Sequence, residues 1–472
     1  MSDGVLVTTL LIAVCPLLML AALSLRRVEG LSPVEIGVVF SAVTTVYALL
    51  PLTGYVLSGF NFDLSIDARV PELSSSPKDV MPVAMLHLFF LFGFCLVYGL
   101  FRPRRRGFAP GDVVVGDWRL PAVLALFAAC AVVLPFVVKA ALGVESSQDY
   151  IGTYLEMVGQ PLWIQQIYGV IQASSSAVVI AALVAAFAFR GRLIFIGAAM
   201  AAGLTLFTIA AGGSRTMAMV TLLSLVVSYA LIVRPISVGR AAVLGALLIF
   251  VFGLGQFLRD FAANEDVSTF AGALVNGEFA SLFINGLDIL QQRDWLIAQG
   301  MLPNLYTVDV ARFAPQQLLP FDKVDPSRWY IETLYPAYAE SGGGLAFGAV
   351  AEAAAGYGPI EALIRGLLLG SLFALVQSVA SRPGLRSLVA LVAYTWLVVF
   401  CYQSLRDTSF SIVARFVYNA VPALVLVKLV EIALSPLKYS ARAAPSNTGK
   451  IGSGKCASEQ QAGAGSIRDD WL

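Results

Sequence analysis

Long apolar runs separated by short polar loops make up most of the chain. A membrane-spanning helix needs about 20 predominantly apolar residues. Eleven runs approach that length, at 4–25, 34–58, 81–101, 120–141, 167–189, 193–211, 216–233, 241–258, 358–380, 387–405 and 411–433. The pattern therefore predicts an all-α, polytopic integral membrane protein with about 11 transmembrane helices.

The composition agrees with this prediction. Hydrophobic residues make up 58% of the chain and charged residues only 13%, whereas charged residues make up about 25% of a typical soluble domain. The formal net charge is +1, and the basic residues are spread over loops rather than gathered on a folded basic face. We therefore expect no nucleic-acid partner. Because the five cysteines show no CxxC spacing, we also expect neither disulfides nor a zinc site.

The basic residues of the short loops fall on one side of an eleven-span arrangement, and that side should be the cytoplasm. These residues are Arg26, Arg27, Arg102, Arg104, Arg105, Arg106, Arg119, Arg190, Arg192, Arg234, Arg240, Arg382, Arg386 and Lys438. The N-terminus and the segment 259–357 then lie on the opposite, outer side of the membrane, and the C-terminus lies in the cytoplasm.

The chain divides into four parts on this interpretation. Residues 1–258 form an N-terminal membrane bundle of about eight spans, and 358–433 form three C-terminal spans. Residues 434–472, rich in Ser, Gly, Ala and Lys, are predicted to be a disordered cytoplasmic tail. Between the two membrane parts, 259–357 is much longer than an ordinary connection. Its many aromatic and charged residues favour a structured outer segment that carries part of a functional site.

Arginines on the outer side are unusual, because the positive-inside bias depletes them there. A guanidinium group binds phosphate oxygens through a planar fork of donors. Each arginine could instead reach the interface or pair with a nearby acid such as Asp260 or Asp407. As a set they predict an anion site, formed by Arg215, Arg259 and Arg406, with Arg293, Arg312, Arg328 and Arg415 as further candidates.

A lone carboxylate close to the outer membrane face is a candidate general base. Glu352 stands in the nearly uncharged stretch Ala351-Glu-Ala-Ala-Ala-Gly356 just before a span, where a charge is costly unless it has a partner or a function. Burial would raise its pKa towards the range useful for proton abstraction. The alternatives are Asp260, Glu278, Glu332 and Glu340. Any of these acids could merely stabilise a helix N-terminus.

Other side chains of the outer segment give weaker indications of function. Trp295, Trp329, Tyr330 and Tyr335 are candidates for stacking on sugar rings, or for packing the segment on the bundle. No DxD motif occurs there, and we expect no metal or other cofactor. The single histidine, His87, lies in an apolar run and is expected to pack inside the bundle.

Several motifs, in this order, resemble the Wzy-type polymerases of oligosaccharide repeat units. They are Gly213-Ser-Arg215, the long outer segment before the last three spans, the stretch from Gly342 to Gly348 followed by Ala351-Glu352-Ala353, and Arg406 between the last two spans. The resemblance covers roughly residues 200–433. Where the family often has Tyr and Asn after the Glu-Ala pair, this chain has Ala354 and Ala355.

The resemblance implies a bundle similar to the GT-C glycosyltransferases and a metal-independent reaction at the periplasmic face of the bacterial inner membrane. A growing glycan would pass from undecaprenyl pyrophosphate to a lipid-linked repeat unit, for O-antigen, capsule or exopolysaccharide. Arginines would hold the pyrophosphate and a carboxylate would deprotonate the acceptor. The partners implied are the lipid-linked oligosaccharides, the bilayer, a chain-length regulator and a flippase.

Three alternatives remain open at this stage. An O-antigen ligase shares the architecture, although the outer segment lacks the histidine that would favour it. A transporter or flippase of anionic glycolipids would place charges around a cavity at mid-membrane, and a membrane scaffold would not need the outer arginines.

Overall fold

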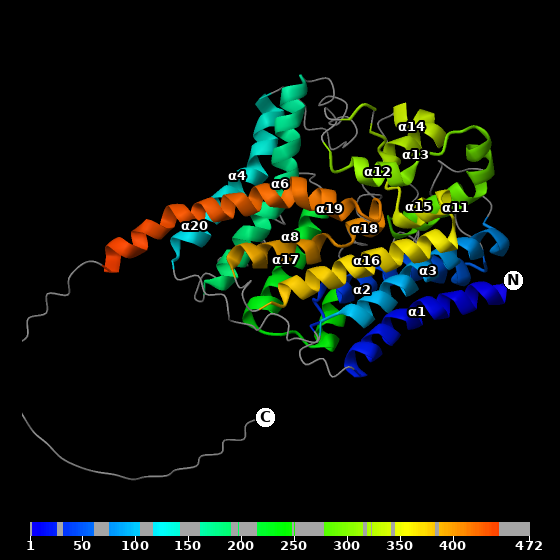
Figure 1. Ribbon diagram of the computed structural model, residues 1–472, viewed down its shortest axis with the longest axis horizontal. Coiled ribbons are helices and arrows are strands. Elements are labelled where there is room, and N and C mark those ends of the chain that lie inside the picture. Colours follow the sequence, from blue (N-terminus) through cyan, green and yellow to red (C-terminus); the bar gives the residue numbers. More distant parts are fainter. Residues whose placement is uncertain are drawn as a thin grey trace, which may run out of the picture.

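The computed structural model describes residues 2–25, 32–60, 75–103, 117–141, 161–189, 197, 215–247, 250, 278–314, 319–321, 323–340, 345–382 and 387–442. Within these residues the chain is helical and contains no strand (Figure 1). The fold is therefore that of an all-α protein, as the sequence predicts.

Four long helices lie against one another along the longest dimension of the molecule (Figure 1). They are α1 (Ser2–Leu25), α2 (Ile36–Leu57), α3 (Pro77–Phe101) and α16 (Pro359–Ala380). Although α3 and α16 are far apart in sequence, they form the most extensive helix pair in the structure.

Glycines allow the backbones of α3 and α16 to approach closely. A Cβ atom on Gly93 of α3 would lie 2.6 Å from the carbonyl oxygen of Leu363, and one on Gly370 would lie 2.7 Å from that of Phe94. A Cβ on Gly366 would collide with the carbonyl of Phe90. Gly366 and Gly370 are four residues apart, which is the small-residue spacing typical of packed membrane helices. This contact fixes α16, and with it the buried charged residues of its first two turns.

Among the described residues, six helices are long and apolar enough to cross a membrane. Three are α1, α2 and α3, and the fourth is α16. The other two are Leu388–Arg406, which contains α17 (Leu388–Phe400) and α18 (Gln403–Arg406), and Ser411–Leu434, which contains α19 (Ser411–Arg415), η4 (Phe416–Ala420) and the start of α20 (Val421–Arg442). These helices support an α-helical, multi-pass membrane protein, and they coincide with six of the eleven predicted spans.

The other predicted spans correspond to shorter described apolar stretches or to undescribed residues. Helices α4 (Arg119–Ala141) and α6 (Leu162–Ala188) pack side by side at a steep angle to α16 (Figure 1). Helix α8 (Arg215–Ser228) continues into η2 (Tyr229–Val233), and Val238–Leu247 is a further short apolar helix. Apart from Gly197, the predicted span 193–211 lies outside the described residues, as do 251–258 and most of the predicted tail.

The described part of the segment 259–357 begins at Glu278 and is largely helical. It contains α11 (Glu278–Ala298), α12 (Leu305–Ala311), α13 (Pro326–Leu334), α14 (Pro336–Glu340) and α15 (Ala349–Ala355). Figure 1 shows α11 and α15 at the end of the molecule where α1 and α16 begin. Both helices pack on α3, and α15 also packs on α16.

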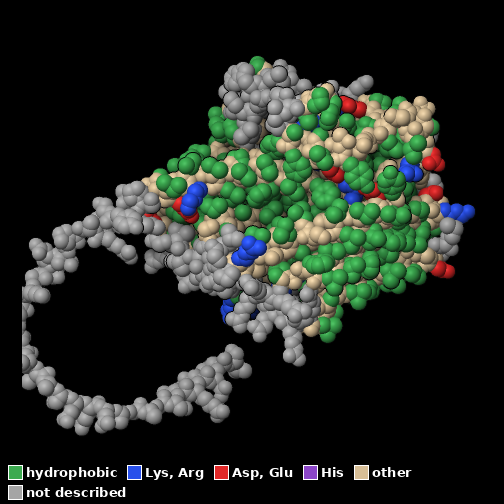
Figure 2. Space-filling model, in the orientation of Figure 1, with side chains coloured by type: hydrophobic (Ala, Val, Ile, Leu, Met, Phe, Trp, Pro, Cys, Tyr) green, Lys and Arg blue, Asp and Glu red, His purple; other side chains and the backbone are tan. Residues whose placement is uncertain are grey.

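Polar residues are buried at the opposite end of α3. Arg102 pairs with Glu35 through two contacts of 2.6 Å, and Tyr98 donates a hydrogen bond to the same carboxylate. Between the two ends, the face shown in Figure 2 is covered mainly by hydrophobic side chains, over α1, α16 and α20. His87 lies in α3, almost fully buried and stacked on Phe283 with ring centroids 5.4 Å apart, which confirms the predicted packing role.

Candidate functional site

The short helix α15 carries Glu352 and is buried along its whole length. It begins after Gly348, whose φ of 91° is accessible to glycine but strained for other residues. The N–H of Gly348 donates a 2.9 Å hydrogen bond to the carbonyl of Asp407, so α15 starts against the turn between the last two candidate spans. Alanines on both sides of Glu352 let α15 fit among α3, α11 and α16. The local sequence therefore delivers one carboxylate into a closely packed interior.

Both oxygens of Glu352 face specific groups. Ser409 donates to Oε2 from its backbone N–H at 2.9 Å and from its hydroxyl at 2.7 Å. The other oxygen, Oε1, lies 2.8 Å from Nη1 of Arg365, yet it accepts no hydrogen bond from the described residues. The two groups are thus at ion-pair distance without hydrogen-bond alignment.

Burial is the main influence on the acidity of Glu352. Its side chain is 0% exposed, and removal from water raises the pKa of the carboxyl to about 7, although the charge of Arg365 and the hydrogen bonds from Ser409 act in the opposite direction. The nearby carboxylate of Asp309 contributes to the increase. A carboxyl with this pKa exchanges a proton readily near neutral pH.

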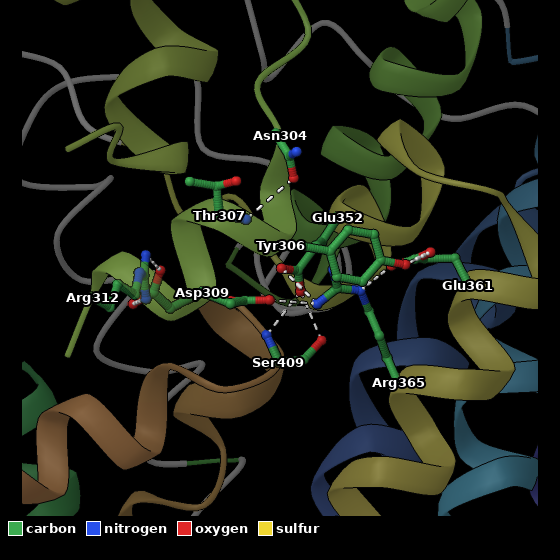
Figure 3. Close-up of polar contacts among 10 residues, drawn as sticks. Asn304, Tyr306, Thr307, Asp309, Arg312, Glu352, Glu361, Arg365 and Ser409 are labelled. Atoms are coloured by element: carbon green, nitrogen blue, oxygen red, sulfur yellow. Dashed lines mark hydrogen bonds and ion pairs between the residues drawn. The ribbon is translucent and has the colours of Figure 1, made fainter. Parts of the chain in front are cut away.

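Arg365 is surrounded by three carboxyl groups (Figure 3). Besides Glu352, it contacts Asp309 at 2.9 Å through Nη1 and Glu361 at 2.6 Å through Nε. The ring of Tyr306 lies 5.2 Å from the guanidinium carbon, and its hydroxyl donates to Glu361, which raises the pKa of Tyr306 to about 12. Nη2 of Arg365 is buried without a hydrogen-bond partner among the described residues. We call Glu352, Asp309, Glu361 and Arg365 the acid–arginine cluster.

A second ion-pair group lies beside this cluster. Arg312 follows α12 and donates two hydrogen bonds of 3.0 Å to the two carboxylate oxygens of Asp407. Arg415 contacts the same carboxylate at 3.3 Å. Burial alone would raise the pKa of Asp407, but the hydrogen bonds and charges of the two arginines lower it below its usual value. Arg406 immediately precedes Asp407 and is partly exposed.

Three candidates from the sequence, Glu352, Arg312 and Arg415, therefore lie in or beside one site, and Arg406 adjoins Asp407 in the chain. Arg293 lies at the edge of this region, where its Nη2 donates to the carbonyl of Gly356 at 2.9 Å and so binds the end of α15. Its Nε is buried and has no hydrogen-bond partner among the described residues.

The remaining described candidates are engaged elsewhere. Arg328 pairs with Glu332 on the exposed surface of α13, at 2.6 Å. The indole N–H of Trp329 donates to the carbonyl of Met301 at 2.9 Å, and Trp295 is exposed on α11.

Tyr330 and Tyr335 donate hydrogen bonds of 2.8 and 2.6 Å to the buried carboxylate of Asp288. Tyr330 is fully buried, which, with the charge of Asp288, raises its pKa well above the usual value. These contacts join α13 to α11, so in this structure both hydroxyl groups bind protein.

The structure does not describe the side chains of four candidate residues. Arg259 and Asp260 lie outside the described residues. Arg215 begins α8 and Glu340 ends α14, but their side chains are also outside the description.

Several residues of the site are not among those expected from the sequence, chiefly Arg365, Asp309, Glu361 and Ser409. A signal exists for two of them: Glu361 and Arg365 are four residues apart within an apolar span, and ionisable residues in such a position point to a functional site. Asp309 and Ser409 carry no comparable local pattern.

The chain matches no known family model, no curated protein and no solved structure. Fold and site together define an all-helical membrane protein with a buried acid–arginine cluster at one end of its bundle.

Proposed function

We propose that this protein is a Wzy-type oligosaccharide repeat-unit polymerase of the bacterial inner membrane. It transfers a growing glycan from undecaprenyl pyrophosphate to the non-reducing sugar of a lipid-linked repeat unit at the periplasmic face. The observation that carries the proposal is Glu352, a buried carboxyl whose pKa is raised to about 7 and whose Oε1 accepts no hydrogen bond. A general base works best when its pKa lies near the working pH.

In the proposed reaction, Glu352 takes the proton of the acceptor hydroxyl. The acceptor oxygen forms a bond to the anomeric carbon of the growing glycan, while the bond from that carbon to the pyrophosphate breaks. The electron pair of the broken bond leaves with undecaprenyl pyrophosphate, and no metal or other cofactor takes part. Asp260 and Glu340 remain alternative bases.

Arg312 and Arg415 are the described arginines best suited to the leaving group, with Arg406 next to them. Arg312 already holds a carboxylate, that of Asp407, through a two-pronged contact. Phosphate offers a similar pair of oxygens to a guanidinium fork, so a pyrophosphate could replace Asp407 there. Such a contact would offset the negative charge that develops as the bond breaks. Arg215, Arg259, Arg293 and Arg328 remain further candidates.

Arg365 has a different proposed role, because three carboxylates already surround it. Its positive charge opposes the effect of burial on Glu352 and so keeps the pKa of that carboxyl near neutrality. It is therefore a positioning residue. Among the aromatic candidates, Trp295 is the most exposed of those described and so the best placed to meet a sugar, ahead of Trp329, Tyr330 and Tyr335.

The experiment that tests the function is deletion of the gene, followed by extraction and sizing of the undecaprenyl-linked glycans. A polymerase predicts accumulation of single repeat units, and complementation with the intact gene should restore the long chains. A strain complemented with Glu352→Gln should keep the defect. Asp294→Asn is the matched control, since Asp294 is an exposed carboxylate of the same segment, on α11.

Two outcomes would contradict the proposal. Full-length polymer stranded on its carrier would identify a ligase instead. An unchanged glycan pool would exclude both enzymes and favour a transporter or scaffold. The proposed topology, with a periplasmic N-terminus and a cytoplasmic C-terminus, can be tested separately with reporter fusions.

A further inference from the structure

The exposed side of helix α12 and of the turn that follows it is largely apolar. Helix α12 buries Leu305, Val308 and Ala311 together with Asp309. Tyr306 and Val310 on α12 and Phe313 in the turn after it are 51%, 73% and 45% exposed. Their i, i+4, i+7 spacing places them along one side. A helix bathed in water normally exposes polar residues, so this exposed apolar stripe indicates apolar surroundings.

Polar contacts hold α12 across two helices that belong to candidate membrane spans. On one side, Tyr306 donates to Glu361 and Asp309 contacts Arg365, both on α16. On the other side, the hydroxyl of Tyr418 in η4 donates to the carbonyl of Phe313 at 3.1 Å. Helix α12 and the turn that follows it therefore bridge α16 and η4.

The positions of these contacts along the spans indicate the depth of α12. Arg365 is six residues beyond Pro359, the first residue of α16. At about 1.5 Å per helical residue, this is roughly 9 Å along the span. Tyr418 is seven residues beyond Ser411, where the last candidate span begins, or about 10 Å along it. The contacts thus lie beside the spans, well past their first residues.

The surfaces on both sides of α12 are apolar and exposed. On α16, Ile360 and Ile364 are 66% and 43% exposed, and in η4, Val417 is 45% exposed. These side chains belong to helices long and apolar enough to cross a membrane, so their natural surroundings are lipid chains. The stripe of α12 continues this surface between them.

We propose that α12 is inserted in the membrane and that Tyr306, Val310 and Phe313 contact the acyl chains of lipids. Lipid suits this surface because the stripe carries no charge, whereas Asp309 of α12 points to Arg365 (Figure 3). Arg312, which follows α12, pairs with Asp407. Tyr306 also contacts Glu361 and Arg365, so only α12 and the ring of this residue separate the acyl chains from the acid–arginine cluster. The inference depends on membrane insertion of the bundle and not on glycan transfer.

Fluorescence quenching in proteoliposomes tests this contact. A small fluorophore is attached to the cysteine of the Val310→Cys variant. The exposed Cys130 and the C-terminal Cys456 are first replaced by serine so that they are not labelled. Cys15, Cys95 and Cys401 are retained because they are buried. Phosphatidylcholine carrying a doxyl group on its acyl chain is the membrane quencher, and iodide is the aqueous one. Leu368→Cys, at an exposed position of α16, is the lipid-facing control. Ala337→Cys, exposed on α14, is the control for the outer segment.

We expect doxyl quenching at position 310 to approach that at position 368 and to exceed that at 337 several-fold, with weak quenching by iodide. Strong iodide quenching and weak doxyl quenching at 310 would place α12 in water and overturn the inference. Protection from both quenchers would also overturn it, because α12 would then be covered by protein.

A second measurement uses the unaltered protein and so does not depend on any variant folding. Vesicles contain a phospholipid with a photoactivatable diazirine on its acyl chain, and labelled peptides are identified by mass spectrometry. Label on the peptide containing residues 306–313 would support the contact. Label on α16 and α20 without label on that peptide would contradict it. Neither experiment needs a glycan substrate, so the inference and the proposed function can fail independently.

Discussion

Ser409 donates two hydrogen bonds to one oxygen of Glu352, from its backbone N–H and from its hydroxyl, at 2.9 and 2.7 Å. This arrangement holds Oε2 and leaves Oε1 facing Arg365. Ser409 belongs to the turn between the last two candidate spans, whereas Glu352 belongs to α15. The site therefore forms only when these two parts of the chain meet.

Replacement of Glu352 by Gln should abolish polymerisation while the protein still folds. The amide has nearly the same shape and can still accept hydrogen bonds from Ser409, but it cannot accept a proton from an acceptor hydroxyl. General bases contribute about 10²–10⁴-fold to a rate, so we expect a loss of that order with purified protein and lipid-linked substrate. Normal chain length in a strain carrying only Glu352→Gln would rule out this residue as the base.

The rate should increase with pH through about 7, because only the ionised form of Glu352 can act as a base. A pH–rate profile of the purified protein in liposomes measures this directly. A profile that is flat across neutrality would mean that Glu352 does not control the rate.

The stability of the folded protein should decrease as pH increases, whereas the reaction rate should increase. The pKa of Glu352 is raised from 4.5 to about 7 on folding, so the folded protein binds more protons than the unfolded chain between these values. The contribution of Glu352 to stability therefore decreases as pH increases through this window. Relative to Glu352→Gln, the intact protein should melt at progressively lower temperature as pH increases from 4.5 to 7. A constant difference in melting temperature would contradict the burial of an ionisable Glu352.

Arg365 should affect both the pH profile and the stability. Arg365→Gln removes the charge that favours ionisation of Glu352, so the rising limb of the rate profile should move to higher pH. It also leaves Asp309 and Glu361 without their guanidinium partner. Breaking a buried pair in this way costs about 3–5 kcal/mol. Arg365→Lys retains the charge and should keep the profile closer to that of the intact protein; identical profiles for both variants would contradict the positioning role.

The sequence allows part of this arrangement to be predicted. Glu352 can be recognised as a candidate site residue because it is a lone acid in an apolar stretch. The long helices can be predicted because their apolar runs match the thickness of a membrane. The pairing of Arg312 with Asp407 cannot be recognised in the same way, since 95 positions separate them and only the packing of α12 on the last spans brings them together. The pairing of Asp309 cannot be predicted from the sequence either, because its partner Arg365 lies on another helix.

The close contact between α3 and α16 should be sensitive to a single methyl group. Gly366→Ala places a Cβ against the carbonyl of Phe90, where the backbone cannot yield easily. Overpacking of this kind typically costs about 1–3 kcal/mol. Gly245→Ala is the matched control, because its Cβ would meet nothing within 4 Å and it also lies in an apolar helix. Thermal unfolding in detergent should show a loss only for Gly366→Ala; equal stability of the two variants would contradict the α3–α16 packing.

The pair of Arg312 and Asp407 should be energetically coupled, unlike the exposed pair of Arg328 and Glu332. Hydrogen bonds to charged groups contribute about 1.5–3 kcal/mol, and the first pair is largely buried, with side chains 18% and 14% exposed. The second pair is 71% and 51% exposed, and such pairs contribute about 0–1 kcal/mol. Double-mutant cycles with Arg312→Ala and Asp407→Asn, and with Arg328→Ala and Glu332→Gln, compare the coupling energies of the two pairs.

If the leaving pyrophosphate binds the guanidinium fork of Arg312, Arg312→Lys should slow glycan transfer although it keeps the charge, since an ammonium group lacks the fork. Arg240→Lys, at an exposed position that is not a candidate for the pyrophosphate site, should leave the rate unchanged. Equal rates for the two lysine variants would exclude Arg312 from the pyrophosphate site.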